Sequence, residues 1–358
     1  MDAKTAFCNI PSSIESRIGR NLHLQPNHPI EIMKCHLFDY FKTLPDYDFK
    51  YIDNLSPFVS IEDNFDKLLI PSHHAARSKS DTYYVNETTV LRTHTSAHQN
   101  QLLSKGCENF LVVGDVYRKD ECDKTHAPIF HQCEGIGKVP ENMDAETELK
   151  RILNGLVEYL FPGCEYRIND DYFPFTKPSY EYEVMYNGKW MEILGCGIMH
   201  PIIVQNNNLE GQYWAWGIGL ERLVMIKSQI PDIRYLWSTH PKFLNQYKNG
   251  MTIFKPYSEL PSMFKDISFW IPNDKINEKW VDENDFFEMA REVMGDWIEQ
   301  IKLMDEFVHP KKEITSRMYR ITFSPIDPSL TDPAKFTEKC NTLQDQFRDR
   351  IKHLVTLR

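Results

Sequence analysis

The stretch VGDVYRKDECDKTHAPIFHQCEG, residues 113–135, decides how this chain is expected to fold. An apolar, β-rich run ends in Arg118, a charged loop follows, and polar residues then recur at every second position of a further run. Alternate residues of a strand point to the same face of its sheet. We therefore expect Phe130, Gln132 and Glu134 to share one face of a strand that lies close to Arg118.

These side chains could form a pocket for a planar anion, and a nucleotide is such a ligand. An arginine can bind a phosphate at two points and stabilise the charge that develops on it. The pocket would be formed by Arg118, Asp120, His126, Phe130, Gln132 and Glu134. Taken alone, the same residues also fit a solvated, charged hairpin. A zinc site is a further alternative, although its spacing is unlike the usual zinc patterns; its ligands would be Cys122, His126, His131 and Cys133.

A second stretch, WAWGIGLERL at residues 214–223, has the features of a phosphate site. Gly217 and Gly219 allow a strand to approach a ligand closely. The helix expected at residues 220–229 begins just after them, and a helix N-terminus favours phosphate. Arg222 lies in its first turn, where it could reach a terminal phosphate. The alternative is a strand packed on a helix, with Arg222 as a surface charge, and the spacing is not that of a dinucleotide-binding loop.

The composition is that of a globular protein with two domains. The chain has 358 residues, of which 41% are apolar and 26% charged, so it can form two cores. Its apolar runs are shorter than the ~18 residues that span a bilayer, and neither a signal peptide nor a transit peptide is visible. The net charge of -10 argues against sequence-independent coating of nucleic acid. The eight scattered cysteines indicate free thiols in a reducing compartment.

Short β-like runs alternate with turns over residues 83–219, which predicts an α+β fold with helices packed on an antiparallel sheet. The dipeptide Asn187-Gly188 between two apolar runs is a strong hairpin signal. Apolar residues at helical spacing predict helices at residues 29–43 and 145–159. A third helix, at residues 220–229, is expected directly after Gly219.

The C-terminal part has the order β-α-β-β-α-β, which is typical of a ferredoxin-like fold. Its strands are expected at residues 266–271, 303–309, 317–324 and 353–357. Its helices are expected at residues 284–301 and 332–351. The whole chain is thus predicted to consist of an N-terminal extension, a larger domain, a linker and a smaller domain, at residues 1–30, 31–244, 245–255 and 256–358.

The two glycine- and arginine-bearing stretches resemble motifs 2 and 3 of the class II aminoacyl-tRNA synthetases. In detail they resemble the single-chain mitochondrial phenylalanyl-tRNA synthetases. Further segments are similar to that family at residues 17–30, 64–84, 91–99 and 229–238. The resemblance runs nearly end to end, and it implies the class II antiparallel sheet, an appended ferredoxin-fold anticodon-binding domain and a monomer.

The resemblance also implies how ATP would be bound. Arg118 would bind the α-phosphate and Arg222 the γ-phosphate, so these two residues are the catalytic candidates. Phe130 would stack on the adenine, and Asp120 would accept a hydrogen bond from its amine. The remaining ATP-binding candidates are Gly217 and Gly219. Mg²⁺ is expected together with ATP, and the carboxylate of Glu192 is one group that could ligate it.

Phenylalanine would be bound beside the ATP. The aromatic pair Phe173 and Phe175 would meet the substrate ring edge-on, and Ala215 would leave room at the floor of the pocket. The resemblance assigns the polar groups around the ammonium, the carboxylate and the adenylate to His94, Ser96, Gln99, His126, Gln132 and Glu134. Trp214 and Trp216 stand where phenylalanine is usual in the family, so a slightly reshaped pocket is expected.

The implied reaction is the activation of L-phenylalanine to phenylalanyl-adenylate, followed by transfer to the terminal adenosine of tRNA(Phe). Tyr319 and Arg320 are expected to meet anticodon bases. Two alternatives remain open, namely an inactive RNA-binding paralogue and an adenylating enzyme with a different acceptor. The resemblance implies the mitochondrial matrix as the location, with the cytoplasm as the alternative.

Overall fold

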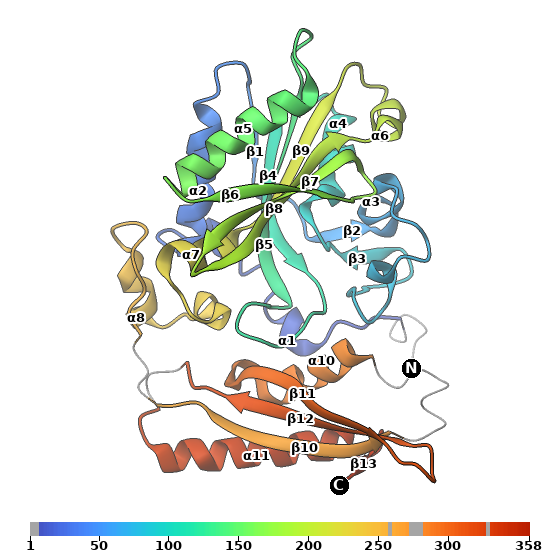
Figure 1. Cartoon of the computed structure of the whole chain (residues 1–358), viewed down its shortest axis with the longest axis vertical. Helices are drawn as coiled ribbons and strands as arrows, with labels where there is room; N and C mark the ends of the chain where they lie inside the picture. The colour runs from blue at the N-terminus through green and yellow to red at the C-terminus, as the bar shows by residue number, and fades with distance from the viewer. Residues whose placement is uncertain (1–6, 257–259, 272–281, 327–329) are drawn as a thin grey trace.

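The structure, a computed structural model, describes residues 7–256, 260–271, 282–326 and 330–358. These residues form a seven-stranded sheet, a four-stranded sheet and a small two-stranded sheet. In Figure 1 the seven-stranded sheet fills the upper part of the molecule, and the four-stranded sheet, coloured orange to red, lies below it. Each of the two larger sheets has its own cluster of buried apolar side chains.

The seven-stranded sheet is almost wholly antiparallel, as expected from the sequence. In spatial order its strands are β1 (Lys50–Ile52), β4 (Phe110–Tyr117), β5 (Ile129–Lys138), β9 (Tyr213–Gly219), β8 (Lys189–Met199), β7 (Thr176–Tyr186) and β6 (Tyr166–Asp171). Only the edge pair β1–β4 is parallel. Asn187 and Gly188 form the β7–β8 hairpin turn with φ of 50° and 75°, which is why glycine and asparagine suit these positions.

Two long helices, α2 (Pro29–Lys42) and α5 (Ala145–Leu160), pack on one face of this sheet (Figure 1). The hydroxyl of Tyr40 in α2 donates to the carbonyl oxygen of Ile152 in α5 at 2.6 Å. Helix α7 (Leu220–Ser228) follows β9 directly. All three helices confirm the sequence prediction to within a residue at each end. Among the residues that the structure describes, no helix combines the length and apolar character that a membrane span requires.

Short elements complete the upper part of the molecule. The two-stranded sheet pairs β2 (Phe58–Ser60) with β3 (Thr89–Leu91). Short α-helices are α1 (Ser12–Glu15), α3 (Ile61–Asn64), α4 (Gln99–Leu103), α6 (Pro201–Asn206) and α8 (Pro241–Leu244). Single 3₁₀ turns are η1 (Leu22–Leu24), η2 (Asp66–Leu68), η3 (Ala75–Arg77), η4 (Thr95–His98), η5 (Ile233–Trp237) and η6 (Asn245–Tyr247).

Two tryptophans of β9 are accommodated by glycines on the neighbouring strand. Gly135 of β5 pairs with Trp216, and Gly137 pairs with Trp214. A Cβ atom on either glycine would overlap the facing indole. The indole of Trp216 stacks on Phe41 of α2 at a centroid distance of 5.0 Å, on the helix-covered face of the sheet. Gly135 and Gly137 thus make room for the two indoles, and Trp216 also borders the larger of the cavities described below, so the expected reshaping of the pocket stays a prediction.

The C-terminal part has the predicted β-α-β-β-α-β order. Its sheet runs β11 (Ile298–Val308), β12 (Thr315–Phe323), β10 (Met263–Ile271) and β13 (Thr356–Leu357) in spatial order. Its helices are α10 (Glu283–Met294) and α11 (Pro333–Ile351), with the 3₁₀ turn η7 (Gly295–Trp297) between α10 and β11. Both helices supply apolar side chains to the same core as the sheet.

The starts of β10 and β13 differ from the prediction by three residues each, and the largest error in this part is the boundary between its first helix and its second strand. The helix expected to reach residue 301 ends at Met294, because Gly295 adopts φ of 55° and turns the chain. Strand β11 then begins at Ile298, five residues before the expected start. Ile301 continued the apolar helical spacing, but it reaches the core from a strand, where it is 5% exposed. Apolar spacing alone did not distinguish the two elements.

The C-terminal part packs against the loop between β4 and β5. Arg291 of α10 donates to the carbonyl oxygen of Asp120 at 2.5 Å. The Lys119 ammonium lies 2.8 Å from the Asp285 carboxylate. The backbone N–H of Ile301 donates to the carbonyl oxygen of Cys122 at 2.8 Å. The loop that carries several candidate site residues is therefore held from both parts of the molecule.

The fit between β5 and β9 can be tested with Gly137→Ala. The new methyl group would overlap the Trp214 indole, and overpacking of this kind costs about 1–3 kcal/mol in the free energy of unfolding. Chemical denaturation would measure the loss. The double variant Gly137→Ala with Trp214→Phe should recover part of it, since the smaller ring vacates the space. Wild-type stability for Gly137→Ala alone would contradict this packing.

Candidate active site

A cavity of about 590 Å³ opens on the face of the large sheet opposite to α2 and α5. A second cavity of about 280 Å³ adjoins it. Both cavities are bordered by Arg118, Asp120, Gln132, Glu192 and Gly217. The larger one is further bordered by the predicted residues His94, Ser96, Glu134, Phe173, Phe175 and Ala215. The smaller one is further bordered by the predicted residues His126, Phe130, Gly219 and Arg222.

Strand pairing explains why residues from two distant stretches meet here. In the β5–β9 ladder, Gln132 lies opposite Gly219 and Glu134 lies opposite Gly217. Because the glycines carry no side chains, nothing from β9 fills the space beside Gln132 and Glu134. His131, which alternates with them along β5, is fully buried on the other face. The prediction that Gln132 and Glu134 share one face of the strand is therefore confirmed.

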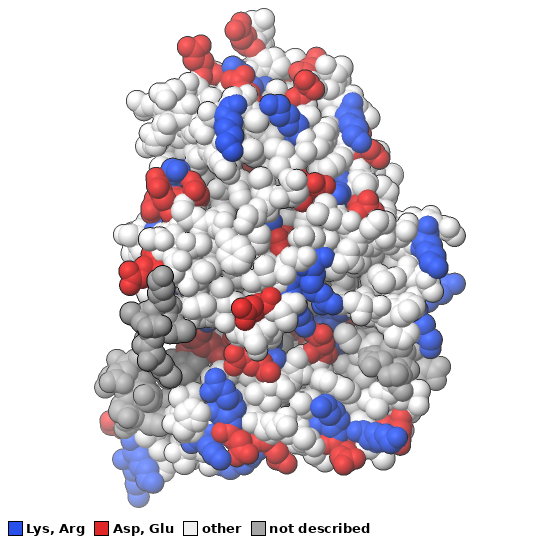
Figure 2. All heavy atoms as spheres, turned by 180° about the vertical axis from the view of Figure 1, so that it is seen from behind, with Lys and Arg blue, Asp and Glu red and all other residues white. Residues whose placement is uncertain are grey.

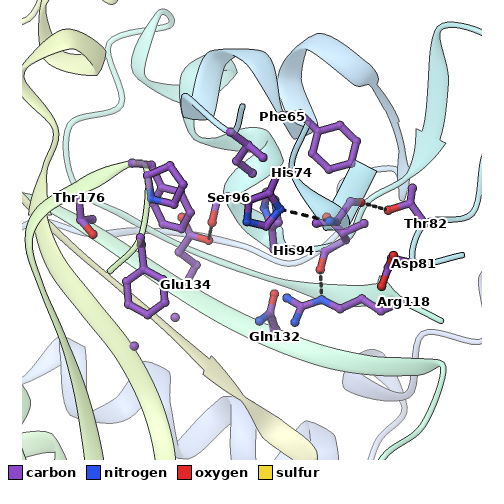
Figure 3. A pocket seen from close by; sticks show the side chains of 18 of the residues that line it. Phe65, His74, Asp81, Thr82, His94, Ser96, Arg118, Gln132, Glu134 and Thr176 are labelled. Atoms are coloured by element: carbon purple, nitrogen blue, oxygen red, sulfur yellow. Dashed lines mark hydrogen bonds between the residues drawn. The ribbon is translucent and has the colours of Figure 1, made fainter. Parts of the chain in front are cut away.

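A buried carboxylate lies at the polar end of the larger cavity. Glu134 accepts hydrogen bonds from the hydroxyls of Ser96 at 2.5 Å and Thr95 at 3.2 Å. Figure 3 shows Ser96, Glu134 and His94 around the same hollow. Burial raises the pKa of Glu134 to about 7, because a charge is costly away from water. A cationic ligand group would favour the ionised form, so this end of the cavity suits an ammonium.

His94 lies in the wall of the same cavity and is a neutral group at physiological pH. Burial, and then the positive charge of Arg118, lower its pKa to about 3. Its ring is 6.4 Å from that of Phe175. It can therefore take part in hydrogen bonds and ring contacts without adding a second positive charge beside Arg118.

The arginine on the shared wall is anchored at its Nε atom. Arg118 Nε donates to the carbonyl oxygen of Thr93 at 2.7 Å. The guanidinium carbon lies 5.2 Å from the centre of the Phe130 ring, and in Figure 3 the guanidinium is turned toward Gln132. Its terminal nitrogens are thus placed between the two cavities, where both an amino-acid carboxylate and a phosphate could meet them.

Arg222 borders the smaller cavity from the first turn of α7. Its Nη1 donates to the carbonyl oxygen of Glu192 at 2.9 Å and is 3.6 Å from the carboxylate of the same residue. The side chain is 40% exposed. A partly exposed guanidinium beside a helix N-terminus is a favourable place for a phosphate.

The other end of the larger cavity is apolar. The rings of Phe173 and Phe175 are 5.9 Å apart. Gly195 of β8 leaves room for the Phe173 ring, since a Cβ atom on Gly195 would lie 2.7 Å from Cζ of that ring. Ala215 closes the space with a single methyl group. An apolar slot with a carboxylate and an arginine at its polar end is chemically suited to an aromatic amino acid.

Two predicted residues lie elsewhere than expected. Gln99 is 2% exposed and is not among the residues that border either cavity, so the structure does not bring it to the amino-acid slot. His126 borders the smaller cavity instead of the larger one. Its Nδ1 lies 2.9 Å from the carboxylate of Asp123, and this hydrogen bond raises the pKa of the imidazole.

The alternative zinc site is wrong. Cys122 packs into the C-terminal core, Cys133 into the core of the large sheet, and His131 against Glu221. Within the described part of the chain, possible ligand atoms converge only at Glu121, Asp123 and His126.

Sequence reasoning missed some residues of the site. Thr95 supports the buried carboxylate, and Thr93 accepts from the arginine. Both stand in the LRTHTSAHQ segment that the sequence already singled out. Asn284 borders the larger cavity from the C-terminal part of the molecule. Nothing in the local sequence of Asn284 indicates this position, because it depends on how the two parts pack.

Comparisons with known proteins identify the family. The profile of the tRNA synthetases class II core domain (F) matches residues 15–247. A phenylalanine–tRNA ligase of Arabidopsis thaliana, named chloroplastic/mitochondrial, is 44% identical over 96% of this chain and 81% of its own. The chain belongs to the phenylalanine–tRNA ligase family. The mitochondrial member from Mus musculus is 40% identical over 90% of this chain and 80% of its own. The mitochondrial member from Saccharomyces cerevisiae is 35% identical over 96% of this chain and 90% of its own.

Membership of this family confirms the resemblance read from the sequence. The match to single-chain ligases spans almost the whole chain, whereas a bacterial ligase alpha subunit from Tolumonas auensis matches 52% of it at 41% identity. The C-terminal unit is therefore part of what this chain shares with the single-chain ligases.

The raised pKa of Glu134 predicts how phenylalanine binding depends on pH. Below about pH 7 the carboxyl group of the free enzyme is protonated, and it would then lose its attraction for the substrate ammonium that the resemblance assigns to it. The KM for phenylalanine in ATP–pyrophosphate exchange should therefore rise as the pH falls from 8 to 6. In Glu134→Gln the KM should be higher throughout and almost independent of pH. A wild-type KM that stays flat across this range would contradict the assignment.

Proposed function

We propose that the two adjoining cavities carry out the ligase reaction, with L-phenylalanine in the larger and ATP in the smaller. The observation that carries this proposal is their shared wall. A slot for an aromatic side chain ends at the buried Glu134, and Arg118 stands where this slot meets the cavity that contains Arg222. The two substrates would thus meet at the amino-acid carboxylate and the α-phosphate.

In the first step, a carboxylate oxygen of phenylalanine attacks the α-phosphorus. A new O–P bond forms, the bond to the β-phosphate oxygen breaks, and pyrophosphate leaves. Arg118 neutralises charge on the α-phosphate, and Arg222 neutralises it on the γ-phosphate. Glu134, with Ser96, would hold the ammonium so that the carboxylate points at the phosphorus. Positioning and electrostatic stabilisation supply most of the rate in such a transfer.

In the second step, the 2′-hydroxyl of the terminal tRNA adenosine attacks the carbonyl carbon of the adenylate. An ester bond forms, AMP leaves with the electrons of the acyl–phosphate bond, and the hydroxyl proton passes to the departing phosphate or to water. Neither step requires a side chain as a covalent nucleophile.

We also propose a division of the chain into domains. An N-terminal extension at residues 1–30 precedes the catalytic domain at residues 31–244. A linker at residues 245–255 connects it to the anticodon-binding domain at residues 256–358.

Mg²⁺ would be bound with ATP, where it supplies positive charge to the phosphates. Carboxylate oxygens are the protein ligands that this ion prefers. Glu192 is suited to the role, since its carboxylate is 52% exposed and it borders both cavities. The chain's own part would be to hold this carboxylate beside Arg222.

The sequence left two other functions open, and the site favours neither. An inactive paralogue has no need of both phosphate-binding arginines, yet Arg118 and Arg222 border the same cavity. An enzyme with another acceptor has no need of an anticodon-binding unit, whereas the C-terminal unit of this chain has the ferredoxin-like order of strands and helices.

The relatives are mitochondrial or chloroplastic by name, which supports the expected mitochondrial location.

The central test of the chemistry is phenylalanine-dependent ATP–pyrophosphate exchange, followed by charging of tRNA(Phe). Arg118→Ala should reduce exchange by about 10²-fold or more, since it removes charge stabilisation in the transition state. Arg151→Ala on α5 is a matched control that should retain exchange, because Arg151 borders neither cavity. Normal exchange by Arg118→Ala would refute its role, and no exchange by the intact chain would refute the ligase mechanism.

The tRNA anticodon would dock on the open face of the C-terminal sheet. Ile267, Phe269 and Ile271 of β10 are at most 3% exposed and face the helices, so the alternate residue Trp270 faces the other way. The Trp270 ring is 6.3 Å from that of Phe307, and the guanidinium of Arg358 lies 4.9 Å above it. Aromatic rings beside an arginine suit unstacked bases.

One of the two residues predicted for this role lies in the core instead. Tyr319 is 1% exposed and packs on Phe286 at a ring distance of 4.6 Å. Arg320 does lie on the open face, where it pairs with Asp266 at 2.8 Å. Figure 2 shows basic and acidic side chains mixed over the back of the molecule. Recognition would thus rest on local contacts.

Trp270→Ala tests this face. Losing one stacking ring should raise the KM for tRNA(Phe) in aminoacylation by about 10-fold, the effect of roughly 1–3 kcal/mol per stacked base. Pyrophosphate exchange should stay at the wild-type rate, because the sheet lies outside the two cavities. Trp190→Ala, at the β7–β8 hairpin, is the control with equal loss of an aromatic ring. An unchanged KM for tRNA in Trp270→Ala would place the anticodon elsewhere.

A further inference from the structure

A buried pair of side chains joins the two stretches that carry the nucleotide site. Glu221, in the first turn of α7, is 3% exposed, and His131, in the middle of β5, is fully buried. The Oε1 atom of Glu221 lies 2.7 Å from Nδ1 of His131. Its Oε2 atom accepts a hydrogen bond from the backbone N–H of His131, also at 2.7 Å. One carboxylate thus binds both the side chain and the backbone of one strand residue.

The partners of this pair are the immediate chain neighbours of candidate ATP-binding residues. Phe130 and Gln132 flank His131 on β5 and face the cavities, whereas His131 faces away from them. Arg222 follows Glu221 on α7. Any shift of the Glu221 carboxylate relative to His131 would therefore change the distance between Arg222 and the two residues of β5 that border the same cavity.

The surroundings of the pair leave little freedom for another arrangement. The imidazole of His131 is stacked on Trp237 at 5.9 Å and lies 5.2 Å from the ring of His23. A carboxylate can only accept hydrogen bonds, so Nδ1 of His131 carries the proton that faces Glu221. Removing one partner leaves a buried polar group without its hydrogen bond, and helix α7 would be released from the strand at this point.

We propose that Glu221 and His131 are positioning residues that set the distance between Arg222 and the ATP-facing side of β5. Glu221 borders the smaller cavity and neither residue borders the amino-acid cavity, whereas Gln132 borders both, so the effect should fall on ATP more than on phenylalanine. The proposal rests on the assignment of Arg222 to the γ-phosphate. The ligase mechanism described above uses only Arg222 of the Glu221–Arg222 dipeptide in WAWGIGLERL. The proposal adds a function for Glu221.

The test separates the KM for ATP from the KM for phenylalanine in pyrophosphate exchange. Glu221→Ala should raise the KM for ATP about 10-fold and change the KM for phenylalanine less than about 3-fold, because the displaced residues Arg222 and Phe130 border only the smaller cavity. Glu221→Gln should restore most of the ATP affinity. Its amide oxygen can accept from the backbone N–H, and its amide nitrogen can donate to Nδ1 of the other His131 tautomer.

A matched control removes an equally buried glutamate away from the nucleotide. Glu148 of α5 is also 3% exposed, and it binds Arg151 and the hydroxyl of Tyr47. Glu148→Ala should lower the melting temperature and leave the KM for ATP unchanged. Circular dichroism would establish that each variant is folded. Should Glu221→Ala not fold, His131→Leu takes its place, since it keeps the backbone N–H that Glu221 accepts from.

Two results would overturn the proposal: a folded variant with the wild-type KM for ATP, or an equal rise in both KM values, which indicates general loosening. Arg222→Ala separates this failure from a failure of the proposed site. If Arg222→Ala raises the KM for ATP and Glu221→Ala does not, only the positioning role is wrong. If Arg222→Ala leaves the KM for ATP unchanged, the γ-phosphate assignment is wrong as well.

Discussion

The pairing of β5 with β4 on one side and β9 on the other is the constraint on which the rest of this structure depends. It places Glu134 opposite Gly217 and Gln132 opposite Gly219. Because side chains alternate across a strand, the same ladder turns Gln132 and Glu134 to the cavity and buries His131 against α7. A slip of one residue would exchange the two sets, and both the polar end of the slot and the contact with Glu221 would be lost.

The site separates its charges in a way that suits two substrates. The carboxylate of Glu134 is buried and supported by hydroxyls, whereas the two arginines lie at and beyond the shared wall. A zwitterionic amino acid would then lie with its ammonium at the buried carboxylate and its own carboxylate toward Arg118. In a site with little water these contacts are stronger than in solution, so they fix the direction in which the carboxylate points.

Much of the fold could be predicted from local periodicity, as could the shared face of Gln132 and Glu134, whereas most of the other site residues were predicted from the resemblance to the family. The three helices around the large sheet and the hairpin at Asn187 follow from spacing and turn chemistry. The errors lie where a residue's role depends on distant packing. Tyr319 alternates toward the core instead of the open face, and Ile301 mimics a helical position from within a strand. Asn284 reaches the wall of the larger cavity only because the C-terminal unit packs against the rest of the molecule. No local sequence pattern encodes that packing.

The most direct measurement is a crystal structure of the protein with a non-hydrolysable analogue of phenylalanyl-adenylate. The shared-wall arrangement predicts the phenyl ring between Phe173, Phe175 and Ala215, the ammonium at Glu134, the phosphate group at Arg118 and the adenine on Phe130. An analogue bound with its adenine in the larger cavity, or with its phosphate group away from Arg118, would contradict the division of the site into an amino-acid slot and a nucleotide cavity.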